Sequence, residues 1–202
     1  NQGEMCSAGS RLIVEESVGA AVLERVVDAG RRMPPGDPLD PATRLGAIVD
    51  RTQLETVLGH IGSARDEGAK VLLGGRQVRR ETGGCYVEPT VFADVDPRMK
   101  IAREEIFGPV LAAITAGDAD EAVKIGNSGV YGLAAAVWTR DISRAHRIAR
   151  ALRSGMVYVN CYDADDITVP FGGFKQSGMG RDKSLHAFDK YTELKTTWID
   201  LS

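Results

Sequence analysis

Cys6 stands in a sequence context that suits covalent chemistry with a carbonyl compound. It lies within residues 1–11, NQGEMCSAGSR, among small residues and glycines, and the apolar run Leu12-Ile13-Val14 follows directly. Glycines allow close approach of backbone and substrate, and the N–H groups of a tight turn can face a developing oxyanion. The pattern is compatible with a nucleophilic thiol. A lone cysteine is more often a small buried hydrophobe, so the residues alone leave both interpretations open.

The segments after this turn alternate between strand and helix patterns. Short apolar runs predict strands, and apolar residues at helical spacing predict helices between them. The alternation predicts an α/β fold with a largely parallel sheet flanked by helices. The predicted strands are residues 11–14, 71–73, 86–92, 110–114, 133–138 and 156–160.

Polar residues at the starts of the predicted helices act as caps. Asp50 with Gln53, and Asp118 with Glu121, have the spacing of a capping box. The predicted N-caps are Ser17, Asp50, Asp118 and Asp141. Gly108-Pro109 should stop any helix that begins near Met99, and the polar residues 76–84 predict an exposed loop or hairpin tip.

Composition narrows the class of protein. The chain has 202 residues, 43% of them hydrophobic, which is enough to bury the core of one domain. Its net charge of −3 argues against nucleic acid or an anionic membrane as the main partner. No apolar run is long enough to span a membrane. The three cysteines show no disulfide or metal-ligand spacing, which indicates a reducing cytosol and no metal site. The three histidines are scattered on predicted helices as surface residues.

Five blocks of sequence together resemble the catalytic half of the NAD(P)-dependent aldehyde dehydrogenases. Each block alone would be a weak signal, but all five stand in the order of that family. They are Asn-Gln-Gly-x-x-Cys at residues 1–6, EEIFGP at 104–109, YGL at 131–133, Val159-Asn160, and PFGGFK-x-SG-x-GR at 170–181. The resemblance implies that Cys6 is the nucleophile and that NAD or NADP is the coenzyme.

The resemblance also implies what the chain contains. Residues 1–190 would be the catalytic domain and residues 191–202 a C-terminal strand that joins a neighbouring subunit's sheet, in a dimer or tetramer. The family's coenzyme-binding domain, its general-base glutamate and its side-chain oxyanion donor would precede Asn1. The backbone N–H of Cys6 would be the oxyanion donor within the chain.

Three residues match coenzyme positions of the family. Glu105 matches the glutamate that binds the ribose hydroxyls on the nicotinamide side, and a carboxylate suits a vicinal diol because it accepts two hydrogen bonds. Phe107 would pack against the nicotinamide or its ribose, and Gln53 aligns loosely nearby. From the residues alone, spacing favours a helix-surface or capping carboxylate for Glu105. Phe107 could be an ordinary core residue, and a capping-box glutamine explains Gln53 equally well.

Further matches fall near the predicted substrate entrance. Asn160 would support the loop that carries Cys6 (residues 1–11, the cysteine loop). Phe171 would line the aldehyde tunnel. The loop before Phe171 carries Asp163, Asp165 and Asp166, where relatives that act on apolar aldehydes have bulky apolar residues. Opposite charges in a partly desolvated cleft attract by about 1–4 kcal/mol, so Asp165 and Asp166 would favour an ammonium-bearing substrate. A solvated acidic loop is the alternative.

The tail from Thr168 to Ala187 is especially similar to bacterial γ-glutamyl-γ-aminobutyraldehyde dehydrogenases of polyamine catabolism. The resemblance therefore implies an ω-amino or γ-glutamylamino aldehyde as substrate. Two other functions stay open for this chain by itself. It could keep only a coenzyme-independent thiol esterase activity through Cys6, or only self-association through its last strand.

Overall fold

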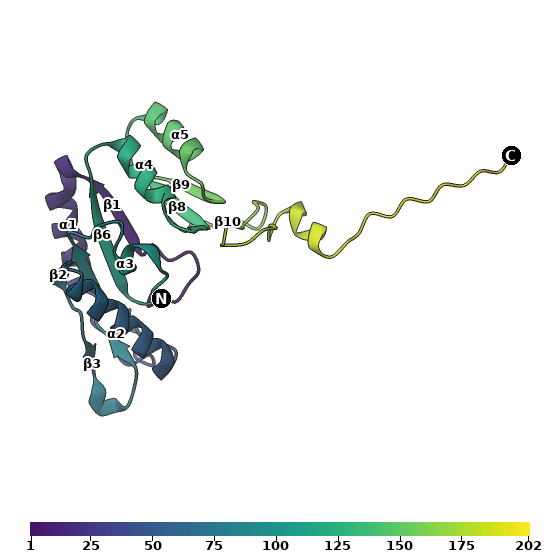
Figure 1. Ribbon diagram of the computed structural model, residues 1–202. Coiled ribbons are helices and arrows are strands. Elements are labelled where there is room, and N and C mark those ends of the chain that lie inside the picture. Colours follow the sequence, from purple (N-terminus) through teal and green to yellow (C-terminus); the bar gives the residue numbers. More distant parts are fainter. The chain divides into compact units, whose positions relative to one another are not determined.

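The computed structural model describes all 202 residues, and they form two compact units, residues 1–129 and residues 130–202. The first unit is built on a sheet in the order β1-β6-β5-β2. Its central pairs are parallel, with Arg11 opposite Ala112 and Thr90 opposite Val110, and only the edge pair of β2 and β5 is antiparallel. The predicted α/β fold with a largely parallel sheet is confirmed (Figure 1). The strands are β1 (Arg11–Glu15), β2 (Lys70–Leu73), β5 (Thr90–Ala93) and β6 (Val110–Ala116).

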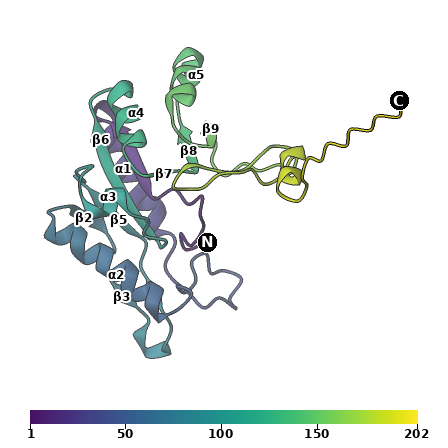
Figure 2. The ribbon, with the colours of Figure 1, turned by 45° about the vertical axis from the view of Figure 1, so that its right-hand side comes forward.

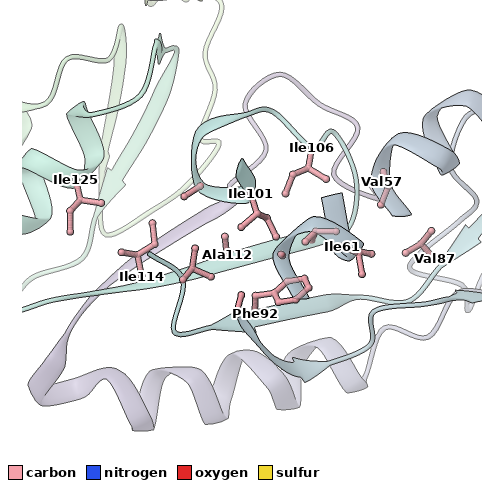
Figure 3. Close-up of a cluster of buried hydrophobic side chains, with 14 of the residues drawn as sticks. Val57, Ile61, Val87, Phe92, Ile101, Ile106, Ala112, Ile114 and Ile125 are labelled. Atoms are coloured by element: carbon pink, nitrogen blue, oxygen red, sulfur yellow. The ribbon is translucent and has the colours of Figure 1, made fainter. Parts of the chain in front are cut away.

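Helices cover both faces of this sheet. α1 (Glu16–Arg31) packs on one face, and α2 (Arg51–Asp66), α3 (Lys100–Arg103) and α4 (Ala119–Asn127) pack on the other, as Figure 3 shows. The main hydrophobic core lies under this second group of helices. Its most buried large side chains include Phe92, Ile61, Ile101, Ile106 and Ile114.

Three of the four predicted caps are confirmed. Asp50 accepts a hydrogen bond from the Gln53 N–H at 2.8 Å, and Asp118 accepts one from the Glu121 N–H at 2.8 Å. Asp141 caps α5 (Ile142–Ala151) through the N–H groups of two residues of its first turn. The prediction of Ser17 as an N-cap is wrong. Helix α1 begins at Glu16, directly after β1, and no side chain caps it.

Two further predictions need correction. The predicted strand 86–92 is broken at Pro89 into β4 (Tyr86–Val87) and β5, because proline supplies no N–H for a ladder. β4 pairs with β3 (Gln77–Val78), and the 3₁₀ turn η1 (Arg80–Thr82) closes the predicted hairpin tip. His60 is not a surface residue: it is 5% exposed in α2, and burial lowers its pKa.

The second unit is built on two small pairs of strands. β8 (Ala134–Val137) and β9 (Met156–Val159) are parallel and joined by α5, which packs on both (Figure 2). β7 (Tyr131–Gly132) pairs with β10 (Phe174–Lys175) in antiparallel fashion. The short η2 (Leu185–Lys190) follows.

Residues 192–202 have no regular secondary structure and are exposed, including Leu194, Trp198 and Leu201. The expected strand needs a neighbouring chain to pair with, so it stays a prediction, as does the division of the chain at residue 190. No helix has both the length and the apolar character to cross a membrane.

Candidate active site

The cysteine loop and the Glu104–Pro109 loop lie side by side in the first unit. Each loop precedes one strand of the parallel pair β1 and β6, so both emerge at the same edge of the sheet. Gly3 has φ +83°, and a Cβ built on it would lie 2.2 Å from the carbonyl oxygen of Gly108. Only glycine permits this approach of the two backbones.

Cys6 lies on a tight turn, as predicted. The Ala8 N–H donates to the Met5 carbonyl at 2.9 Å, which puts Cys6 and Ser7 at the centre of the turn. Cys6 is exposed, whereas its neighbour Ser7 is only 6% exposed. The interpretation of Cys6 as a small buried hydrophobe is therefore wrong, and the turn presents its thiol outward.

Glu4 ties this turn to the chain before α2. Its Oε1 accepts a hydrogen bond from the Val49 N–H at 3.0 Å, and its Oε2 accepts one from Gln2 Nε2 at 2.6 Å. Both carboxylate oxygens are thus used within the protein. The cysteine loop is held at Glu4 and at Gly3, on the N-terminal side of the thiol.

The Glu105-Ile106-Phe107 segment divides its side chains between core and surface. Ile106 is 1% exposed and belongs to the core, so its two neighbours turn outward. Glu105 lies beyond the end of α3 at Arg103, and its exposed carboxylate has no partner within the chain. Phe107 is 36% exposed and has φ +55°, a left-handed conformation that is uncommon for a bulky residue. The helix-surface interpretation of Glu105 and the core interpretation of Phe107 are both wrong.

Gln53 supports this segment from α2. Its Nε2 donates to the carbonyl oxygens of Ile106 and Phe107, each at 2.9 Å, while its own backbone N–H is capped by Asp50. The capping-box prediction is therefore half right, because the side chain turns away from the cap. With both N–H groups bound to backbone, Gln53 positions Phe107, and its contact with a ribose stays a prediction.

Gln53→Glu is expected to lower the free energy of unfolding by about 1–3 kcal/mol, since it removes two donors and sets a carboxylate against two carbonyl oxygens. Urea unfolding measures the change. Gln77→Glu is the control, because Gln77 lies in the same unit and its side chain makes no hydrogen bond. Equal changes in both variants would contradict the positioning role.

In the second unit, Asn160 joins the ends of β8 and β9. Its Oδ1 accepts from the Thr139 N–H and its Nδ2 donates to the Thr139 carbonyl, both at 2.9 Å. Asn160 itself has φ +54°, which asparagine tolerates better than most residues. The amide therefore ties neighbouring loops together, and its predicted support of the cysteine loop stays a prediction.

The carboxylates of the acidic loop are bound within the second unit. Asp165 forms an ion pair with Lys183. Asp166 accepts hydrogen bonds from the hydroxyl and the N–H of Thr168, each at 2.7 Å, and these hydrogen bonds lower its pKa. The carboxylates of Asp165 and Asp166 therefore both have partners within the chain.

Phe171 is fixed by a short antiparallel bridge to Asp182. The two residues exchange backbone hydrogen bonds of 2.8 and 2.7 Å. The ammonium of Lys183 lies over the Phe171 ring, 5.6 Å from its centroid. Lys183 thus brings together two predicted substrate residues, Phe171 and Asp165.

Sequence reasoning missed Gly3 and Lys183 as residues that build these sites. Gly3 lies within the cysteine motif, but its contact with Gly108 depends on a strand pairing far along the chain. Lys183 has no sequence signal of its own, because its partner Asp165 lies 18 residues away. Also missed was the aromatic cluster of Tyr158 and Tyr162 with Trp138, whose rings lie 5.6 and 6.3 Å apart.

Comparisons with known proteins show the family to which the chain belongs. The aldehyde dehydrogenase family pattern matches residues 1–197. The NADP/NAD-dependent aldehyde dehydrogenase PuuC of Escherichia coli is 48% identical over 201 residues, which cover 100% of this chain and 40% of that protein. A γ-glutamyl-γ-aminobutyraldehyde dehydrogenase of Burkholderia cenocepacia is 58% identical with a TM-score of 0.94, covering 97% of this chain and 40% of that one.

A third relative has a different named substrate. An indole-3-acetaldehyde dehydrogenase of P. syringae, solved with NAD⁺ and IAA, is 59% identical with a TM-score of 0.96 and covers 99% of this chain and 40% of that one. Identity thus does not distinguish the substrates named for these relatives. This chain spans about 40% of their length and is matched by the family pattern over nearly all of its own. It belongs to the aldehyde dehydrogenase family.

Proposed function

We propose that this chain supplies the nucleophile and part of the coenzyme site of an NAD(P)-dependent aldehyde dehydrogenase. The observation that carries the proposal is the exposed thiol of Cys6 on a turn whose loop packs against the loop of Glu105 and Phe107. A nucleophile and a coenzyme platform must lie close together if hydride is to leave a carbon bound to the thiol.

Cys6 would act by covalent catalysis. Its sulfur attacks the aldehyde carbon to give a thiohemiacetal, and the carbonyl oxygen takes up negative charge that the Cys6 N–H can stabilise. A bound nicotinamide coenzyme would supply the hydride acceptor for oxidation to the thioester. Water then attacks the thioester carbon, releasing the carboxylic acid and restoring the Cys6 thiol.

The residues beside the cysteine loop fit such a coenzyme. The Glu105 carboxylate is exposed and unpartnered, so it can accept two hydrogen bonds from a ribose diol. Phe107 offers an exposed aromatic surface, and Gln53 fixes the backbone that carries it. This choice of NAD or NADP as coenzyme is supported by the coenzymes named for PuuC and for the P. syringae relative.

We infer an ω-amino or γ-glutamylamino aldehyde as substrate. The B. cenocepacia relative is named for a γ-glutamylamino aldehyde, and the loop beside Phe171 carries more carboxylates than cations. Residues 191–202, exposed and unpaired, would form the strand that joins a second copy of the chain.

Selective labelling of Cys6 tests the proposal. Iodoacetamide is added in stoichiometric amount near neutral pH, with and without 3-aminopropanal, and the alkylated cysteines are mapped by mass spectrometry. Cys6 is expected to react at least about ten times faster than Cys161 and to be protected by the aldehyde, because an activated thiol reacts through its thiolate. Cys161 is an internal control, since it is also exposed. Equal, unprotected labelling of both would contradict the proposal.

A further inference from the structure

Lys183 lies at the centre of a mixed-charge cluster in the second unit. Its ammonium pairs with the Asp165 carboxylate and lies 5.6 Å from the centroid of the Phe171 ring. The side chain is 27% exposed, so the charge is partly removed from water while its far side stays open. In such a setting a charge interacts more strongly than on an open surface.

The backbone at Lys183 has an uncommon conformation that hydrogen bonds on both sides maintain. Lys183 and Ser184 have φ +59° and +52°, two consecutive residues with positive φ, neither of them glycine. Hydrogen bonds on both sides enforce this conformation: Asp182 bridges to Phe171, and the Ser184 N–H donates to the Ile167 carbonyl at 2.8 Å. Strain that the surrounding structure maintains in this way points to a functional constraint.

Charges of both signs face each other here. Burial raises the pKa of Tyr158, Asp163 and Asp165 add to this rise, and Lys183 opposes it, so all these charges act on the same phenol. The geometry places one carboxylate, that of Asp165, and one ammonium, that of Lys183, beside the Phe171 ring. This arrangement complements a ligand that also carries both charges.

We propose that Lys183 determines specificity by binding a substrate carboxylate, so that the cluster recognises the zwitterionic amino-acid end of a γ-glutamylamino aldehyde. The substrate carboxylate would bind the Lys183 ammonium, and the substrate ammonium would bind the Asp165 carboxylate. A simple ω-aminoaldehyde offers only an ammonium, which must compete with Lys183 for Asp165. This inference rests on the proposed function and selects between its two substrate classes.

Binding to the chain itself tests the inference. γ-Glutamylethylamide carries the zwitterionic end without an aldehyde, and propylammonium carries a single positive charge. Each is titrated into the protein while the amide resonances of residues 158–184 are followed by NMR. Lys183→Met is expected to weaken γ-glutamylethylamide binding about tenfold and to leave propylammonium binding equal or tighter, because the competing cation is removed. Lys183→Arg, which keeps the charge, should stay within about threefold of the wild type.

Lys190→Met is the matched control. Lys190 pairs with Asp182, one residue before Lys183 in sequence, but has no contact with Phe171, so its loss should leave both ligands unaffected. Unchanged γ-glutamylethylamide binding in Lys183→Met, or no binding to the wild type at tens of millimolar, would overturn the inference. If Lys183→Met fails to fold, Lys183→Gln takes its place, because it also removes the charge and is expected to weaken γ-glutamylethylamide binding by the same factor.

The labelling of Cys6 separates this inference from the proposed function. If Cys6 is labelled rapidly and protected by the aldehyde, but γ-glutamylethylamide binding does not depend on Lys183, the inference is wrong and the proposed function is supported. Slow labelling of Cys6 together with binding that depends on Lys183 would leave an amino-acid site and remove the dehydrogenase function.

Discussion

Cys6→Ser is expected to abolish covalent acylation of the chain by p-nitrophenyl acetate. The wild type should take up one acetyl group rapidly, because an exposed thiol on the turn can attack an activated ester without coenzyme. A serine hydroxyl is almost fully protonated near neutral pH, so the rate should fall by about a thousandfold or more. Intact-mass spectrometry measures the acetylated fraction over time, and the released nitrophenolate gives the burst.

Cys161→Ser is the matched control for this prediction. It makes the same substitution at another exposed cysteine, and it should leave the burst unchanged. If the burst remained in Cys6→Ser and disappeared in Cys161→Ser, the nucleophile would be Cys161 in the second unit. A burst unaffected by both would assign the acylation to ordinary surface groups.

Gly3→Ala is expected to slow the same acylation by about 10- to 100-fold, because a displacement of about 1 Å can cost that much in a positioned reaction. The added methyl would lie 2.2 Å from the Gly108 carbonyl oxygen, and a backbone atom cannot rotate away as a side chain can. The cysteine loop must therefore move away from the loop that carries Glu105 and Phe107. The acetylation rate and urea unfolding are measured on the same samples.

Gly83→Ala is the control that measures the cost of a positive φ without a steric contact. Gly83 has φ +74°, close to that of Gly3, but a Cβ there meets nothing within 4 Å. It should cost about 1–2 kcal/mol of unfolding free energy for the left-handed conformation and leave the acylation rate unchanged. If both variants acylate at the wild-type rate, the contact of Gly3 with Gly108 does not position Cys6.

The sequence alone determined the features that depend on neighbouring residues. Asp50, Asp118 and Asp141 were identified as caps because each binds N–H groups two or three residues further along, a contact that needs only the local helix. The turn at Cys6 was found for the same reason. The alternation of apolar segments was enough to indicate a largely parallel sheet, because helical connections between strands require it.

The tertiary structure decided how those elements are used. Gln53 was assigned to a local capping box, but its amide binds carbonyl groups 53 and 54 residues away. Because Ile106 is buried in the core, Glu105 and Phe107 face outward. The spacing of these residues alone does not predict which of them faces the core. The pairing of Asp165 with Lys183 changed the charge of the acidic loop across 18 residues of chain. In each case the deciding contact lies far along the sequence, and its formation depends on strand pairing and core packing that no local pattern encodes.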